Sequence, residues 1–252
     1  MGRNGGIFVA SVASDCREAA KRWGLGVESD RFCTAAEMDE PDALAREEGF
    51  LTGVPRRIVH GPFNELSTAA IEPRVTEITR ARFLQACGLA KRLGAEKLVL
   101  HTGYIPLIYY PEWYIGRSVA FWRDFLDKHP DAPPIVLENV LERDPAIPLE
   151  IVRQVNDPRL RLCLDVGHTN AQERALPAGE WVRRTAPWIS HVHLHNNDGT
   201  WDTHSPLFWG TIPMKELLLL LEELAPDATW TLETREAEAS CRLLAEHGWI
   251  ER

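Results

Sequence analysis

Two stretches of the sequence place histidines and acidic residues close together at the spacing of β-strands. The first reads LRLCLDVGHTN (residues 160–170), and the second reads HVHLHNNDGTWDTH (residues 191–204). Side chains alternate between the two faces of a strand, so His191, His193 and His195 share one face. Imidazoles and carboxylates crowded on one side of a sheet need positive charge between them, which a divalent cation supplies. The two stretches therefore predict metal chemistry.

The elements that position these residues follow a regular alternation of strand-like and helical patterns, which predicts parallel strands joined by crossover helices. Eight strands are expected at residues 7–11, 25–29, 57–60, 97–101, 135–138, 161–165, 190–195 and 229–233. Eight helices are expected at about residues 15–22, 41–48, 73–93, 111–128, 146–155, 179–186, 213–224 and 235–246. The chain has no linker, composition break or GxGxxG turn, which favours one closed barrel over an open doubly wound sheet.

The carboxyl ends of the strands carry the active site of a parallel barrel. Six successive predicted strands end in a histidine or an acid, namely His60, His101, Glu138, Asp165, His193 and Glu233. His168 follows three residues after Asp165, and Asp202 and His204 form a D-x-H pair after the seventh strand. One such residue alone is more often a cap or a satisfied core group. Six in succession favour a shared metal site, since divalent metals neutralise carboxylates and bind imidazoles.

Length and composition limit the classes of protein that fit. With 252 residues, 44% apolar and 26% charged, the chain matches a soluble globular protein the size of one eight-fold α/β barrel. The net charge of −9 repels polyphosphate, which disfavours nucleic acid as a partner without excluding it. The five scattered cysteines form no CxxC pair and no apolar run is long enough to cross a membrane, so we expect a cytoplasmic protein.

The constellation resembles the xylose isomerase-like TIM-barrel superfamily, which includes the endonuclease IV family and many sugar isomerases and epimerases. The most specific pieces are LDVGH at 164–168, HVHLHNNDG at 191–199 and LET at 232–234. The resemblance covers essentially the whole chain and implies a single (β/α)8 TIM-barrel domain over residues 1–252.

The resemblance implies two ligand sets. In the isomerase and epimerase branch one metal ion is held by Glu138, Asp165, His193 and Glu233, the two glutamates also act as acid and base, and His168 contacts a substrate oxygen. In the endonuclease branch three zinc ions occupy nine ligand positions, which those five residues fill together with His60, His101, Asp202 and His204.

The leading interpretation is an isomerase or epimerase that acts on a carbohydrate-like ketone or polyol with one ion, zinc or manganese before magnesium or cobalt. Proton transfer would then run between Glu138 and Glu233. The expected substrate contacts are His60, His101, His204, Trp201 and Arg143. The alternative is an endonuclease IV-like phosphodiesterase with three zinc ions, acting on abasic DNA or on a small phosphoester. A noncatalytic barrel ranks last because no expected ligand is missing.

Several properties stay open at the level of the sequence. They include the substrate and whether it carries phosphate, the identity and number of the metal ions, and whether the chain forms a homo-oligomer. The register of the strand at residues 191–195 matters for the ligand assignment. If the strand were shifted by two residues, His191 or His195 would be the ligand in place of His193. The aromatic loop at residues 104–114 is expected to cover the substrate, to contact a partner subunit or to pack on its own helix.

Overall fold

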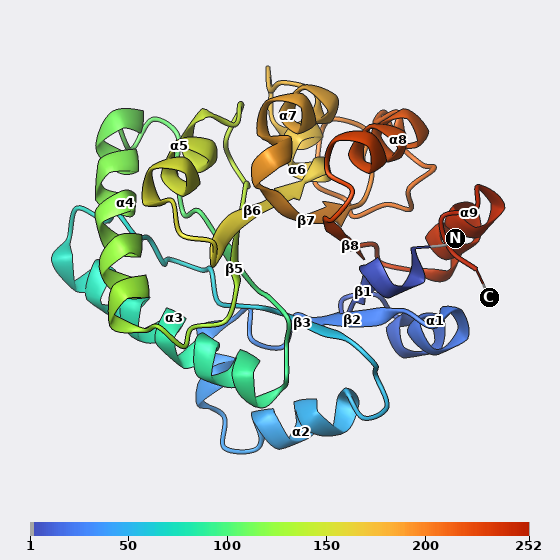
Figure 1. Cartoon of the computed structure of the whole chain (residues 1–252), viewed down its shortest axis with the longest axis horizontal. Helices are drawn as coiled ribbons and strands as arrows, with labels where there is room; N and C mark the ends of the chain where they lie inside the picture. Colours follow the sequence, from blue (N-terminus) through green and yellow to red (C-terminus); the bar gives the residue numbers. More distant parts are fainter. Residues whose placement is uncertain (1–2, 252) are drawn as a thin grey trace.

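The strands of the computed structural model, which describes residues 3–251, close into a parallel barrel in chain order, with β8 paired to β1 (Figure 1). The strands are β1 (Ile7–Ala10), β2 (Gly26–Ser29), β3 (Arg57–His60), β4 (Leu98–His101), β5 (Ile135–Glu138), β6 (Leu160–Asp165), β7 (Ile189–Leu194) and β8 (Thr229–Leu232). Each strand therefore lies where the sequence predicts it, to within one or two residues. The predicted (β/α)8 TIM barrel is confirmed.

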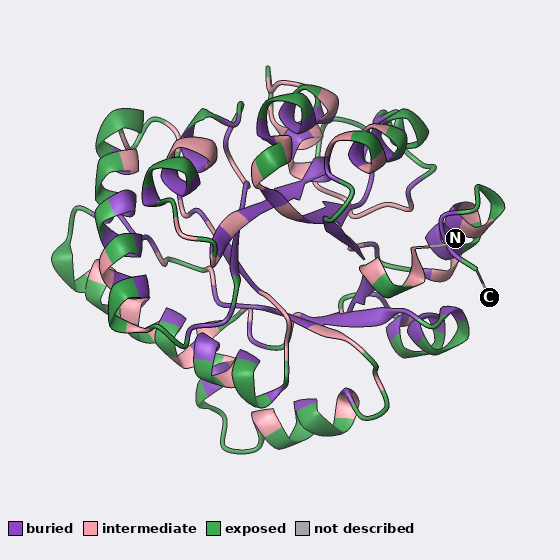
Figure 2. Cartoon of the chain, in the orientation of Figure 1, coloured by how far each residue is buried: buried purple, intermediate pink, exposed green. Residues whose placement is uncertain are grey.

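Helices surround the barrel and bury their inner faces against it, as the exposed outer faces in Figure 2 show. They are α1 (Cys16–Trp23), α2 (Ala43–Phe50), α3 (Pro73–Arg92), α4 (Pro111–Lys128), α5 (Ala146–Val155), α6 (Val166–Ala171), α7 (Ala178–Thr185), α8 (Met214–Leu224) and α9 (Glu238–Glu246). Short 3-10 turns lie at Asn4–Gly6, Ala35–Asp39 and Ala186–Trp188. Among the described residues, no helix has both the length and the apolar character that crossing a membrane requires.

The prediction of eight helices is wrong, because the described residues contain one more helix. This helix, α6, follows β6 without a loop. Its six residues include glycine and asparagine and are too few to show a helical pattern. A side-chain cap starts this short helix: the Asp165 carboxylate accepts a hydrogen bond of 2.7 Å from the backbone N–H of His168. The last helix also begins at Glu238, later than expected, because residues 233–237 form the loop after β8.

The barrel interior is layered. Phe8, Ile58, Val99, Val136 and Cys163 form a separate buried cluster from five strands. Side chains two residues apart in a strand point the same way. The next inward layer toward the carboxyl ends of β3 to β6 is therefore made of the residues two positions later, His60, His101, Glu138 and Asp165. An apolar floor thus lies directly beneath the polar residues.

We expect the Phe8→Ala variant to lose about 3–5 kcal/mol of unfolding free energy, because Phe8 is fully buried and a cavity would remain in the floor. Urea unfolding measures the loss. The Leu219→Ala variant is the control, since this side chain of α8 is 52% exposed and should change stability by less than about 0.5 kcal/mol. Equal losses in the two variants would contradict the layered interior.

Candidate metal centre

The barrel brings all nine predicted ligands to one mouth. Each lies within 3.6 Å of at least one other member of the set, which comprises His60, His101, Glu138, Asp165, His168, His193, Asp202, His204 and Glu233. The structure places the two remaining predicted site residues, Trp201 and Arg143, on the exposed surface. Their role in binding substrate stays a prediction.

The centre of the mouth is a group of four residues from four strand ends. One ligand atom from each of Glu138, Asp165, His193 and Glu233 lies within 4.8 Å of the others. Nδ1 of His193 is 3.0 Å from Oε2 of Glu233, 3.5 Å from Oε1 of Glu138 and 3.6 Å from Oδ2 of Asp165. The register of β7 against β6 pairs His193 with Asp165, and this puts His193 rather than its neighbouring histidines at the centre.

The carboxylate of Glu138 faces two groups at once. Oε1 points toward the central group, whereas Oε2 is 3.1 Å from Nε2 of His60 and 3.3 Å from Nε2 of His101. His60, His101 and Glu138 form a second cluster with metal-ligand spacing. Glu138 itself is almost wholly buried, with 1% of its surface exposed. Each oxygen of this carboxylate therefore faces a separate group of potential ligands.

A third cluster lies on the other side of the central group. Oδ2 of Asp202 is 3.2 Å from Nε2 of His168 and 3.0 Å from Nε2 of His204. Asp202 and His204 belong to the loop after β7, and His168 belongs to α6. The D-x-H pair and the histidine after Asp165 therefore converge although 34 and 36 residues separate them in sequence.

Backbone carbonyls accept a hydrogen bond from Nδ1 of three histidines in the mouth. Nδ1 of His60, His168 and His204 donates to the carbonyl oxygens of Gly61, Asn139 and Glu233, at 3.0, 2.8 and 2.8 Å. A carbonyl oxygen only accepts, so each Nδ1 carries the hydrogen and the neutral ring presents the lone pair of Nε2. A lone pair aimed at a carboxylate is repelled unless a proton or a metal ion lies between them.

In the metal-free site, protons take the place of metal ions between the imidazoles and the carboxylates. Burial alone would raise the pKa of Glu138 and Asp165, but the surrounding imidazoles outweigh it and hold both pKa values well below their usual range. Burial alone would lower the pKa of His60 and His204, but hydrogen bonds to Glu138 and Asp202 raise each to about 9. Protons on the imidazoles thus supply the positive charge that the carboxylates require, and divalent cations could replace them.

Buried polar atoms without a hydrogen-bond partner test whether a metal fits. Among the described residues, Nδ1 of His193 and of His195, Oδ1 of Asp202 and Oε2 of Glu233 are such atoms. Most buried polar atoms in folded proteins have partners. Four orphaned nitrogen and oxygen donors at one mouth fit divalent cations that accept mixed imidazole and carboxylate ligands, such as zinc or manganese.

The sequence did not reveal how closely His195 joins this site. Nε2 of His195 is 3.1 Å from both oxygens of Asp165, and its ring stacks on His204 at 4.2 Å between centroids. His195, His204 and Glu233 form a further cluster with metal-ligand spacing. The ring fits only because residue 167 is glycine, whose missing Cβ would lie 1.9 Å from Cε1 of His195.

A cavity of about 350 Å³ adjoins the mouth on the β3 and β4 side. Its wall includes His101, Phe63, Tyr104 and Tyr109, and the ring of Phe63 stacks on that of His101 at 4.1 Å. Part of the aromatic loop at residues 104–114 thus lines the cavity beside His101.

Known families and curated proteins include relatives of this chain. The family model described as xylose isomerase-like TIM barrel matches residues 18–252. An uncharacterized protein of Methanocaldococcus jannaschii is 30% identical over 202 residues, which cover 75% of this chain and 69% of the relative. The probable endonuclease 4 of Mycobacterium tuberculosis is 27% identical over 146 residues, which cover 55% of this chain and 56% of the relative.

Solved structures show the same fold along the whole barrel. A D-tagatose 3-epimerase-like protein superposes with a TM-score of 0.79 at 24% identity, covering 96% of both chains. A Thermus thermophilus protein described as soaked with zinc chloride superposes with a TM-score of 0.77 at 27% identity, covering 96% of this chain and 97% of that chain. The similar proteins thus include names from both the epimerase and the endonuclease branches.

We expect the Gly167→Ala variant to lose roughly 1–3 kcal/mol of unfolding free energy, because the new methyl group would collide with the His195 ring. The double variant Gly167→Ala/His195→Ala should lose clearly less than the sum of the two single variants, since the collision disappears with the ring. Denaturant unfolding of the metal-free proteins measures all three losses. Simple additivity would show that the two residues do not touch.

Zinc should stabilise the folded chain, because the donor atoms converge only after folding. At about 100 times its Kd, one bound ion adds about 2.7 kcal/mol, which raises the Tm of a chain this long by roughly 5–10 °C. The Glu138→Gln variant should lose most of this rise, whereas Glu47→Gln, a buried carboxylate on α2, should keep it. A scan by calorimetry with and without zinc checks the shift, and an unchanged Tm would contradict the site.

Proposed function

Because this chain belongs to the xylose isomerase-like TIM-barrel family, we propose that it is a metal-dependent enzyme that binds more than one divalent ion and hydrolyses a phosphoester. The observation that carries the proposal is the carboxylate of Glu138, whose two oxygens face different ligand groups. This favours the alternative of the sequence analysis over the single-ion isomerase.

The position of Glu138 suits a metal ligand better than a general base. A general base must reach the proton that it removes, at hydrogen-bond distance. Both oxygens of Glu138 instead contact imidazoles, with His60 and His101 on one side and His168 and His193 on the other. Glu233 is less enclosed, with 13% of its side chain exposed. A symmetric pair of proton-transferring glutamates is therefore not favoured.

The charge of the mouth links the number of ions to the class of substrate. Glu138, Asp165, Asp202 and Glu233 place four negative charges there when the imidazoles are neutral. One divalent ion would leave the mouth negative, which suits a neutral sugar and repels phosphate. Three divalent ions would make it positive, which suits a phosphoester. Full retention of nine ligands supports the second case.

Each cluster would hold one ion in this proposal. His60, His101 and Glu138 would hold the first, Glu138, Asp165, His193 and Glu233 the second, and His168, Asp202 and His204 the third. Bound divalent ions would stabilise negative charge on the phosphoryl group and make a water molecule more acidic. The chain itself fixes the ligand atoms through the carbonyl contacts of His60, His168 and His204. The cavity beside His101 would receive the organic part of the substrate.

A second candidate function is epimerisation or isomerisation of a neutral carbohydrate-like substrate. The four-residue central group favours it, since it offers a complete ligand set for one ion, and the fold is shared with the D-tagatose 3-epimerase-like structure. Glu138 and Glu233 would then move the proton and His168 would contact a substrate oxygen. The remaining substrate contacts would be His60, His101, His204, Trp201 and Arg143.

Metal content and two variants separate these functions. We expect about three ions per chain by elemental analysis, and release of phosphate or nitrophenol from model phosphoesters without interconversion of ketoses. His101→Ala and His204→Ala should each lower the hydrolysis rate by at least about 100-fold, because each removes a ligand. Glu47→Gln is the control for a buried carboxylate away from the mouth.

The opposite results in these measurements would support the epimerase function. One ion per chain, ketose interconversion, and an effect of His204→Ala on KM alone would overturn the phosphoesterase proposal. His101 and His204 lie outside the central group of four ligands. A single-ion enzyme should therefore keep its one bound ion in both variants.

A further inference from the structure

We propose that Glu28 is a positioning residue for the metal centre: it orients His193 so that Nδ1, and not Nε2, is the metal-binding atom. Glu28 is the last residue but one of β2 and lies beneath the central ligand group, with 1% of its surface exposed. The inference rests on the metal-binding part of the proposed function. It holds for either reaction, because it concerns a ligand and not a substrate.

The hydrogen bonds of Glu28 fix the ring of His193. Oε1 of Glu28 is 3.0 Å from Nε2 of His193, and Oε2 is 3.0 Å from Nε2 of His191. The hydroxyl of Thr231 also donates to Oε2. An ionised carboxylate only accepts, so both Nε2 atoms carry hydrogen. His193 therefore turns its other nitrogen, Nδ1, toward Glu138, Asp165 and Glu233, where it has no hydrogen-bond partner among the described residues.

A chain of contacts below Glu28 holds the second histidine in place. Nδ1 of His191 is 2.6 Å from Oγ1 of Thr229, and Nζ of Lys97 donates to the same hydroxyl oxygen at 2.7 Å. Because Nε2 of His191 carries the hydrogen, Nδ1 of the neutral ring accepts, and the hydroxyl of Thr229 donates to it. His191 then accepts at Nδ1 and donates at Nε2 to Glu28. Both nitrogens of His191 are thus hydrogen-bonded, and the fixed ring holds the carboxylate of Glu28 in place.

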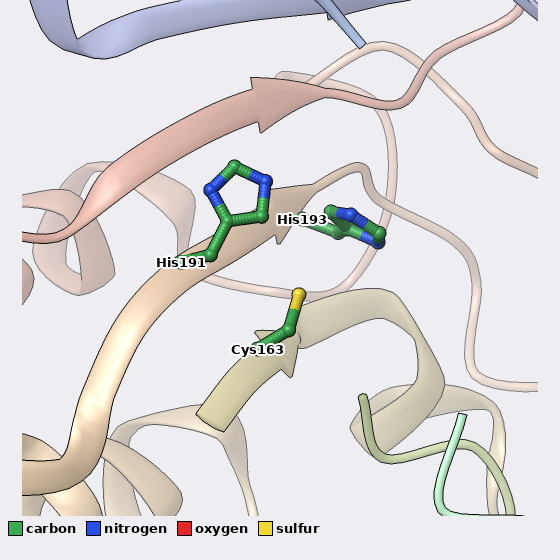
Figure 3. Close-up of side chains that lie close together, drawn as sticks. All are labelled: Cys163, His191 and His193. Atoms are coloured by element: carbon green, nitrogen blue, oxygen red, sulfur yellow. The ribbon is translucent and has the colours of Figure 1, made fainter. Parts of the chain in front are cut away.

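The same contacts argue against a separate metal site deeper in the barrel. Cys163, His191 and His193 lie close together, with the sulfur of Cys163 turned toward the space between the two rings (Figure 3). Such a cysteine and histidine group is a common ligand set for zinc. Here both Nε2 atoms face Glu28 and Nδ1 of His191 faces Thr229. The deeper cluster therefore supports the ligand above it.

The support of His193 differs in kind from that of its neighbours. His60, His168 and His204 donate from Nδ1 to neutral backbone carbonyls. His193 donates from Nε2 to a carboxylate, which polarises the ring more strongly and raises the basicity of the nitrogen that faces the metal. We therefore expect His193 to be a stronger metal ligand than His60, His168 or His204.

The test compares metal affinity in Glu28→Gln with that in wild type and in Glu47→Gln. We expect the Kd of zinc for its tightest site to rise about 10–100-fold in Glu28→Gln, because an amide is a weaker acceptor than a carboxylate. Glu47→Gln, a buried carboxylate that bonds to Arg31 outside the barrel, should bind zinc as wild type does. Titration against a chelating dye measures the Kd without any assay of activity.

Two spectroscopic measurements use the wild-type protein, so they do not depend on whether a variant folds. In the zinc-loaded protein labelled with ¹⁵N-histidine, long-range ¹H–¹⁵N correlations should show His193 protonated at Nε2 and not at Nδ1. In the cobalt-loaded protein the thiolate-to-cobalt charge-transfer band should be missing, because Cys163 is not a ligand.

Each contrary result has a distinct meaning. Zinc bound through Nε2 of His193, a thiolate–cobalt band, or an unchanged Kd in Glu28→Gln while His193→Ala loses zinc would overturn the role of Glu28 alone. Unchanged zinc binding in His193→Ala would overturn the metal-binding function itself, and the role of Glu28 with it.

Discussion

Repulsion between buried carboxylates is the constraint on which this structure depends. Glu28, Glu138 and Asp165 have almost no exposed surface, and Glu233 and Asp202 join them at the same barrel mouth. Water cannot screen such charges, so positive charge must lie among them. In the metal-free chain imidazolium groups supply it, as the raised pKa of His60 and His204 indicates. Divalent cations would supply it more fully, and for this reason both the ligand geometry and the charge support the proposed function.

The parallel barrel meets this constraint by placing apolar, orienting and acidic side chains on the inward faces of its strands. Apolar side chains such as Phe8 and Val136 form the floor. Glu28 and His191 form an orienting layer whose hydrogen bonds fix the central imidazole. The ligands lie above them at the strand ends, where loops and α6 add the remaining donors. Side chains two residues apart on a strand point the same way, so a short strand such as β5 supplies both a floor residue, Val136, and a site residue, Glu138.

Much of this arrangement could be predicted from the sequence, because strand alternation fixes which face a residue takes and parallel strands end at one edge. The eight strands and the convergence of Glu138, Asp165, His193 and Glu233 follow from these two rules. The helix α6 escaped prediction because a side-chain cap, not composition, starts it. The contacts of Glu28 and His195 escaped because they join residues 165 and 30 positions apart. Patterns within one segment carry no information about such pairs. The position of Glu138 between two clusters could not be predicted either, because it depends on the rotamer of its side chain.

In the proposed enzyme, several cations share the carboxylates of this mouth. Anomalous diffraction at the zinc absorption edge, from crystals of the zinc-loaded chain, tests it most directly. We expect one peak within the group of Glu138, Asp165, His193 and Glu233 and a second on the His60 side of Glu138. A single peak would contradict the multinuclear site, and no peak within the ring of these residues would contradict the account as a whole.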